Sequence, residues 1–258
     1  MNTLMTRAIA LTCFAWMTNA QAAVVQPSAL LSEEYVFNSA VDTINNDRMI
    51  NPVNGGDSLA TALTAVHEFG GVYDGSFVTT DPGSFPSDFF DSLPDGDTDV
   101  DLVFDITGGG DTSLGSVILW NYENSGGSNI SAGNHARTIE LRFNSEADGS
   151  ESFDGPATTV TLLPVWDGDE DDTNDLQGVN SAQAFSLGTP VTARYAMLSI
   201  TDNYLGFQGI TGGGDRVGLA EVRFASETVV PEPSTLSLLA LAAATMVAGV
   251  ARSSRTAA

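Results

Sequence analysis

The sequence predicts an all-β protein, an antiparallel jelly-roll β-sandwich placed between two terminal targeting segments. Apolar and polar residues alternate in several short runs, and Gly, Asp, Asn and Pro separate these runs. No sustained helical period accompanies them. Many short strands joined by polar turns are typical of sandwiches and jelly rolls. The predicted sandwich occupies residues 23–228, about 205 residues, which is enough for a complete hydrophobic core.

The clearest strands follow from the period-2 pattern. In residues 137–144, Ile139, Leu141 and Phe143 alternate with polar neighbours, as expected for a strand with one buried face. The other predicted strands are residues 116–122, 158–163, 193–201 and 217–224. One helix is expected at Ser58–Phe69, with Leu59, Leu63 and Val66 on one face.

The N-terminus has the three parts of a secretory signal peptide over residues 1–22. Arg7 supplies the positive charge, residues 8–17 form the apolar region, and Ala20-Gln21-Ala22 has the small-residue pattern that signal peptidase cleaves. The single cysteine, Cys13, lies inside this segment. The mature chain therefore has no thiol for a disulfide, a nucleophile or a zinc ligand.

The C-terminus, residues 229–258, combines a rigid motif, an apolar run and a basic tail. Pro231-Glu232-Pro233 favours extended backbone ahead of residues 236–250. As a helix this run is about 22 Å long, shorter than the roughly 30 Å hydrocarbon core. The basic residues in 252–255 would keep the end on the cytoplasmic side. An ordinary buried C-terminal helix would need neither the entry motif nor the basic exit.

This tripartite end resembles the PEP-CTERM sorting signal of Gram-negative bacteria that produce extracellular polysaccharide. The resemblance implies processing by an exosortase, near Pro231, Glu232 and Pro233. The expected route is export, transient association with the inner membrane through residues 236–250, and then the cell surface or extracellular matrix.

The chain is strongly acidic, with 33 Asp and Glu, nine Arg, no Lys and a formal net charge of −24. Such a field repels nucleic acid and anionic lipid heads, so the sequence favours neither as a partner. It also attracts divalent cations where carboxylates converge.

A second resemblance covers residues 114–224. Segments 117–124 (VILWNYEN), 134–143 (NHARTIELRF), 182–204 and 217–224 (VGLAEVRF) occur in the order of strands in discoidin-type, or F5/8 type C-like, galactose-binding domains. The resemblance implies an eight-stranded jelly roll that often holds a structural calcium. That calcium would lie at Glu221 and Ala220 on the closing strand, facing Asp47 or Asn45 in an opposing loop. The alternative is that Glu221 is a surface charge.

Two acidic runs, Asp95–Asp101 and Asp167–Asp175, lack the Gly and Glu positions of an EF-hand loop. Solvated turns are the preferred interpretation, with loose calcium binding as the alternative.

Motifs for catalysis are missing. His67 and His135 have no zinc-protease spacing, and no G-x-S-x-G elbow or phosphate loop occurs. A carboxylate pair for glycoside hydrolysis cannot be identified from sequence alone. The preferred hypothesis is thus a non-catalytic module that binds exopolysaccharide or a surface glycan. One alternative is a calcium-dependent structural matrix protein; another is a secreted polysaccharide hydrolase or lyase.

A sugar site at one end of the sandwich would need loop aromatics and a few polar groups. The candidate ligand-binding residues are His135, Arg137, Asn203 and Tyr204. Each of them has a competing interpretation as a core or turn residue.

Overall fold

The computed structural model describes residues 21–67, 75–80, 87–94, 96–122, 132–164, 180–207 and 209–227. Nearly all of them belong to one compact unit, Ala22–Glu227. The sorting segment, the acidic run Asp167–Asp175 and all but the end of the predicted signal peptide lie outside the described residues. None of the helices within the described ranges has the length and apolarity needed to cross a bilayer.

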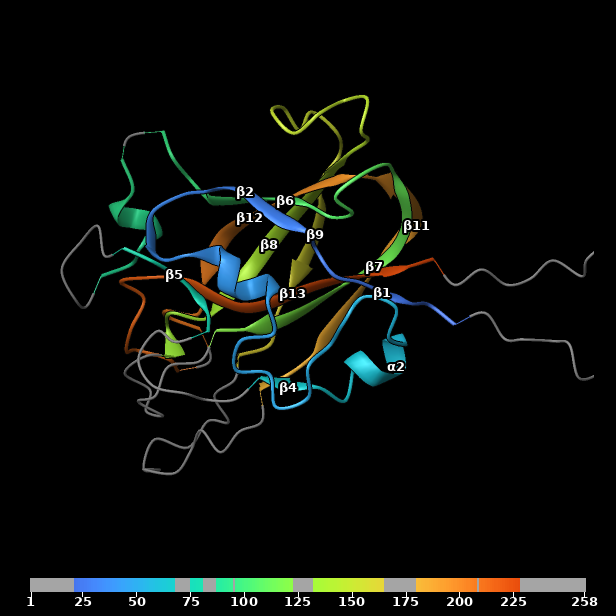
Figure 1. The fold of residues 1–258 in the computed structure, drawn as a ribbon. Coiled ribbons are helices and arrows are strands. Elements are labelled where there is room, and N and C mark those ends of the chain that lie inside the picture. Colours follow the sequence, from blue (N-terminus) through green and yellow to red (C-terminus); the bar gives the residue numbers. More distant parts are fainter. Residues whose placement is uncertain are drawn as a thin grey trace, which may run out of the picture. The chain divides into compact units, whose positions relative to one another are not determined.

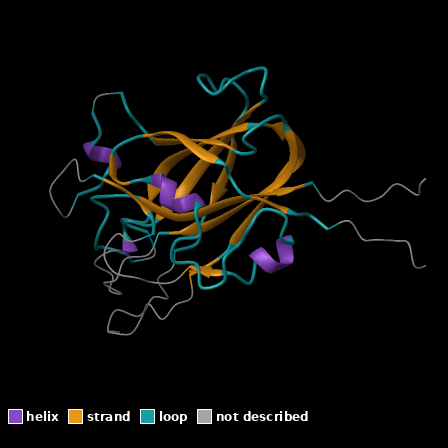
Figure 2. Ribbon diagram, in the orientation of Figure 1, coloured by secondary structure: helices purple, strands orange, loops and turns teal. Residues whose placement is uncertain are grey.

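Two antiparallel sheets form the unit, and strands dominate it (Figures 1 and 2). In the larger sheet the strand order is β11-β7-β13-β5-β3, with β1 also paired to β13. Its strands are β1 (Val24–Val25), β3 (Val36–Asn38), β5 (Phe77–Thr79), β7 (Thr112–Asn121), β11 (Gln183–Ala193) and β13 (Gly218–Ser226).

The second sheet has the order β2-β6-β12-β8-β9. Its strands are β2 (Ala29–Glu33), β6 (Val100–Asp105), β8 (Ala136–Asn144), β9 (Thr158–Thr161) and β12 (Tyr195–Asn203). A separate two-stranded ladder joins β4 (Val66–His67) to β10 (Asn180–Ser181). Two short 3-10 helices are η1 (Ala40–Ile44) and η2 (Phe90–Ser92).

The main core lies between the two sheets. It combines side chains of the second sheet, such as Leu102, Ile139 and Leu198, with Leu119 and Phe224 of the larger sheet, and all five are fully buried. Two sheets that bury their facing side chains against each other form a sandwich. The predicted antiparallel β-sandwich is therefore confirmed.

The central strands of the larger sheet are also covered on their outer face. Ile118 and Trp120 of β7 point away from the main core and pack in a second cluster with Val53 and Ala62. The chain between η1 and β4 thus forms a cover over β7 and β13. Trp120 donates its indole N–H to the carbonyl of Ala65 at 3.1 Å, which fixes this cover to the sheet.

The predicted helix Ser58–Phe69 is wrong in its second half. Ser58 caps the helix, because its hydroxyl accepts the N–H of Thr61, but α2 spans only Leu59–Ala62. Val66 and His67 instead pair with β10. A ladder partner more than a hundred residues away overrides the local helical period, as tertiary contacts commonly do for short segments.

The predicted strands are found, with shifted ends. The strand expected at 193–201 corresponds to β12, which begins at Tyr195, while Ala193 ends β11. Strand β11 contains Gly188 and Pro190, which are turn residues, and its ladder with β7 is interrupted between Ser186 and Val191. A bulge of this kind admits Pro and Gly into a strand.

Candidate functional site

The four candidate ligand-binding residues lie at one end of the sandwich. Arg137 is the second residue of β8, and Asn203 ends the neighbouring β12, where it pairs with Ala136. His135 forms an isolated bridge with Gly218 at the start of β13, and Tyr204 follows Asn203 directly. Sequence reasoning therefore placed these residues at a common end, although their side chains have different surroundings.

His135 is an interior residue. Its side chain is 2% exposed, and its ring packs edge-on against Tyr122 with 6.5 Å between the ring centroids. Burial lowers the pKa of His135 to about 3, because the charged imidazolium would lose its hydration. The ring is neutral at physiological pH and does not face solvent.

Asn203 and Tyr204 hold the loop between β12 and β13. The Asn203 side chain donates to the Gly214 carbonyl at 3.1 Å and accepts the Leu205 N–H at 3.0 Å. Tyr204 donates its hydroxyl to the Leu162 carbonyl at 2.5 Å. Both residues are buried, so they shape this end of the sandwich from within.

Arg137 is the candidate that reaches the surface. Its guanidinium carbon lies 3.4 Å from the centroid of the Phe207 ring, and one of its terminal nitrogens pairs with Asp202. The Arg137 side chain is 24% exposed and Phe207 is 40% exposed. The Nε of Arg137 has no acceptor among the residues that the structure describes. We call Arg137, Asp202 and Phe207 the Phe207 platform.

Sequence reasoning missed Phe207 and Asp202. Phe207 lies in a tight loop in which Gly206 and Gly209 both have positive φ angles. The Gly206 N–H donates to the Ile210 carbonyl, and the Ile210 N–H donates to the Phe207 carbonyl, each at 2.9 Å. Glycine tolerates this backbone without steric cost. An aromatic residue flanked by two glycines was the available sequence signal for a displayed ring.

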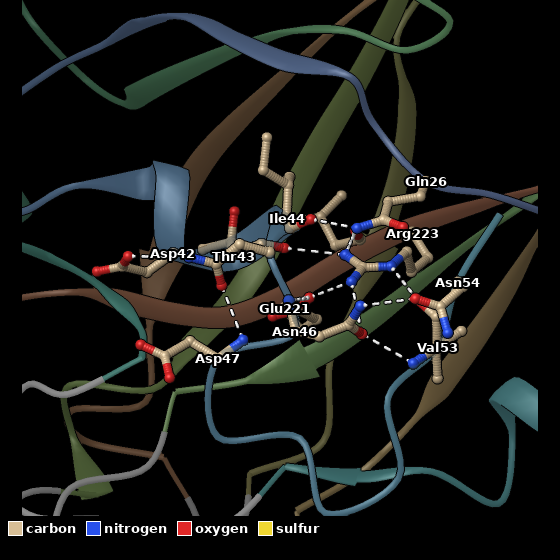
Figure 3. Close-up of polar contacts among 12 residues, drawn as sticks. Gln26, Asp42, Thr43, Ile44, Asn46, Asp47, Val53, Asn54, Glu221 and Arg223 are labelled. Carbon is tan, nitrogen blue, oxygen red and sulfur yellow. Dashed lines mark hydrogen bonds and ion pairs between the residues drawn. The ribbon is translucent and has the colours of Figure 1, made fainter.

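Glu221, one of the predicted calcium ligands, belongs to a second candidate site, a buried ion pair with Arg223 on β13. Glu221 and Arg223 alternate on one face of the strand, and both side chains are fully buried. Arg223 places a terminal nitrogen 2.5 Å from Glu221 Oε1 (Figure 3). The Asn46 N–H donates to the same Glu221 oxygen at 3.2 Å. Glu221 is therefore an interior residue, and the interpretation of it as a surface charge is wrong.

Arg223 satisfies all five of its N–H groups. Besides Glu221, it donates to the carbonyl oxygens of Val53, Thr43 and Val222 at 3.0, 3.3 and 2.7 Å. Its fifth bond goes to Asn46 Oδ1 at 2.9 Å. Five donors is the full capacity of a guanidinium. The acceptors come from η1, the loop after it and β13, so one side chain joins three stretches of chain.

Burial dominates the electrostatics of this pair. Desolvation raises the pKa of Glu221 to about 7, although Arg223 and the Asn46 N–H act in the opposite direction. Burial likewise lowers the pKa of Arg223. The second carboxylate oxygen, Glu221 Oε2, is buried with no hydrogen-bond partner among the described residues.

The other predicted calcium ligands do not turn toward this carboxylate. Asn45 and Asp47 are exposed, and their side chains bond within their own turn. Asn45 Oδ1 accepts the Asp47 N–H at 2.7 Å, and Asp47 Oδ1 accepts the Arg48 N–H at 3.1 Å. Figure 3 shows the Asp47 carboxylate directed away from Glu221. The Ala220 methyl group packs in the second cluster, on the outer face of the larger sheet, which we call the outer cluster.

These residues fit a calcium ion poorly. Calcium takes six to eight oxygens at about 2.3–2.6 Å. Carbonyl, amide and carboxylate oxygens do converge at this point, but they surround a guanidinium. Across the described part of the chain, no group of three His, Cys, Asp or Glu side chains is arranged to hold a metal.

The acidic run Asp95–Asp101 is divided by the fold. Asp97 accepts the Tyr35 hydroxyl in an irregular stretch, whereas Asp101 lies in β6 and accepts Ser199 Oγ at 2.5 Å. Burial, with neighbouring carboxylates, raises the pKa values of Glu34 and Asp99. Of these two, Glu34 accepts the Asp101 N–H at 3.1 Å.

Comparison with known proteins identifies the C-terminal segment. Residues 229–255 match the PEP-CTERM protein-sorting motif, so the sorting motif predicted around Pro231–Pro233 is confirmed. The chain therefore combines an antiparallel β-sandwich with a C-terminal PEP-CTERM sorting motif, the signal that marks a protein for export and sorting. No curated protein matches the chain.

Several solved structures share the sandwich fold at low sequence identity. The family 32 carbohydrate-binding module of NanJ from C. perfringens, in complex with galactose, is 13% identical, with a TM-score of 0.39 over 80% of this chain and 99% of that one. A fucose-binding module from Streptococcus pneumoniae is 11% identical, with a TM-score of 0.39 over 80% and 96%. An F5/8 type C domain from Bacteroides fragilis is 10% identical, with a TM-score of 0.43 over 81% and 99%.

Proposed function

We propose that the protein is a non-catalytic carbohydrate-binding module, delivered to the cell surface or extracellular matrix, and that the Phe207 platform contacts the sugar. The observation that carries the proposal is the display of Phe207, with Arg137 and Asp202 beside it, at a loop-bearing end of the sandwich. An exposed aromatic ring packs against the C–H face of a sugar, and adjacent charged groups bond to its hydroxyls.

The net charge of the protein limits which class of glycan it can bind. A chain with a net charge of −24 repels polyanions at long range, most strongly at low ionic strength. Arg137 is already paired with Asp202, so the platform offers no net positive charge to offset that repulsion. We therefore propose a neutral exopolysaccharide or surface glycan as the ligand.

The binding test compares two exposed phenylalanines, each with an arginine over its ring. Phe37 on β3 is 51% exposed and has Arg216 at 5.0 Å, so Phe37→Ala is a matched control for Phe207→Ala. Retention of residues 22–227 is measured on immobilised polysaccharide from the producing bacterium, with neutral and acidic fractions kept apart. The main core and the second cluster both lie within this segment, so residues 22–227 are the form to test.

We expect saturable binding of the wild type and of Phe37→Ala to the neutral fraction. Phe207→Ala should bind about 5- to 30-fold more weakly, since stacking on one ring contributes roughly 1–2 kcal/mol. Equal retention of the two variants would place the site elsewhere. Loss of polysaccharide chain length during incubation would instead indicate the hydrolase or lyase alternative.

For the sorting step we propose that the Pro-Glu-Pro motif is cut by an exosortase while residues 236–250 hold the chain at the inner membrane. Changing Glu232 to Ala should leave an uncleaved, heavier chain in the membrane fraction, whereas the wild type appears outside the cell at lower mass. A matched change of Glu227, just before the motif, should have no effect on processing. Release of the Glu232→Ala chain at the lower mass would argue against this route.

A further inference from the structure

We propose that the Arg223 guanidinium is the built-in cation that fastens the segment between η1 and α2 onto the closing strand β13, so that this domain folds without a metal at that point. The resemblance to discoidin-type domains implies a structural calcium there. The structure places a side-chain cation in contact with the oxygens that a metal would need.

The first argument is the hydrogen-bond inventory. Thr43, Asn46 and Val53 belong to the covering segment, and each gives one oxygen to Arg223. The remaining two acceptors, Val222 and Glu221, belong to β13 itself. With five donors facing five acceptors, no N–H of the guanidinium is left over, and each of these five oxygens already accepts a hydrogen bond. Glu221 Oε2 is the one oxygen of the cluster without a partner among the described residues, and a single oxygen is far fewer than calcium requires.

The second argument is charge. One carboxylate, Glu221, faces the guanidinium, and both groups are excluded from water. A calcium ion added to this cluster would bring its two positive charges close to that of Arg223, with one buried carboxylate to balance three charges. Like charges repel strongly where the surroundings have a low dielectric constant. The nearby Asp47 points outward and does not restore the balance (Figure 3).

The third argument is that the hydrogen bonds of Arg223 position the covering segment between η1 and α2. Asn46 has a positive φ angle of 65°, which asparagine tolerates better than most residues. Its side-chain oxygen accepts both the Arg223 N–H and the Val53 N–H, the latter at 2.7 Å. The Gln26 side chain, just after β1, donates to the carbonyl of Ile44, the last residue of η1, at 2.7 Å. Arg223 therefore organises a turn that encloses it.

The experiment measures the thermal midpoint of residues 22–227 in millimolar calcium and in a millimolar chelator. We expect the same midpoint in both for the wild type. Arg223→Met should lower the midpoint by roughly 10 °C in either condition, because it leaves Glu221 and four other oxygens buried without their donor. The control is Arg142→Met, which removes an arginine whose side chain is 26% exposed and paired with Glu140.

A second variant covers the case in which Arg223→Met does not fold. Arg223→Lys keeps the charge but has three donors instead of five, so we expect an intermediate midpoint that is again independent of calcium. Wild-type calcium binding is also measured by calorimetry, where no heat of stoichiometric binding should appear. A wild-type midpoint several degrees higher in calcium, stoichiometric binding heat, or equal midpoints for Arg223→Met and Arg142→Met would overturn the proposal.

Discussion

The backbone N–H of Gly133 donates to the carbonyl of Gly212 at 2.9 Å, and this contact leaves no space for a side chain. A β-carbon on Gly133 would lie 2.5 Å from the Gly212 oxygen and 2.8 Å from the Gly214 nitrogen. Two turns that precede β8 and β13 thus meet backbone to backbone. The same loop of residues 204–214 carries Phe207, so this contact helps to position the platform.

Replacing Gly133 with Ala should destabilise the protein. The atoms that the new methyl group meets are backbone atoms, which cannot rotate away, so we expect a loss of about 1–3 kcal/mol in the free energy of unfolding. Urea denaturation measures the loss. Gly109→Ala is the matched control, because a β-carbon there has nothing within 4 Å. Equal stability of the two variants would contradict the predicted clash.

Glu221 should make the protein less stable as the pH rises from about 4.5 to about 7. Burial raises the pKa of Glu221 from 4.5 to about 7, so in this window the folded state holds a proton that the unfolded state has released. The stabilising contribution is complete below pH 4.5 and is lost as the pH passes 7. A shift of this size corresponds to about 3 kcal/mol.

The measurement compares the pH dependence of unfolding for the wild type and Glu221→Gln. The variant loses the titrating group and should lack this part of the slope, whatever its absolute stability. Glu140→Gln is the control, since Glu140 is partly exposed beside Arg142 on β8. If Glu221→Gln and the wild type have parallel profiles between pH 4.5 and 7, Glu221 does not titrate there.

His135 should stay neutral far below the ordinary pKa of imidazole. Its folded-state pKa of about 3 lies below the unfolded value near 6.5, so acid favours unfolding as the pH falls from 6.5 toward 3. We expect the NMR signals of His135 to remain constant from pH 8 to about 4.5 in the folded protein. In urea the same imidazole should titrate near 6.5. A titration of the folded protein near pH 6 would show that the ring is solvated.

The sandwich could be predicted because alternation is a local property of the sequence. In β8, the inward residues Ile139 and Leu141 are visible from the period alone. The short strand β4 could not be found in this way, since its partner β10 lies more than a hundred residues away. A local reading therefore extended the helix past Ala62, where the structure ends it.

The sites were harder to predict because their chemistry depends on contacts between distant residues. Glu221 and Arg223 are two apart, so a shared strand face was foreseeable. The five oxygens around Arg223 were not, since Asn46 lies 177 residues earlier in the chain. Asn203 and Tyr204 lie at the same end of the sandwich as Arg137, but their bonds to Gly214 and Leu162 hold them inside the protein.

Trp120 should be a second link between the sheet and its outer cover, beside the contacts of Arg223. Its indole N–H bonds to the Ala65 carbonyl at 3.1 Å, and its fully buried ring packs in the outer cluster with Met49 and Val53. Trp120→Phe leaves that carbonyl without its donor and creates a small void, so we expect a loss of about 2–3 kcal/mol. Leu163→Ala is the control, because Leu163 is 66% exposed and its loss should have little effect on stability.

The loss of stability caused by Trp120→Phe should appear first in the cover, the chain between η1 and β4. The Leu63 N–H donates to the Leu59 carbonyl in α2 at 3.0 Å, and this helix has only four residues to support itself. We therefore expect faster hydrogen exchange at the Leu63 amide than overall destabilisation accounts for. The amide of Leu141 in β8 should change only with global stability, since it lies in the other sheet. Equal acceleration at both amides would mean that the cover does not open separately, because it unfolds together with the sandwich.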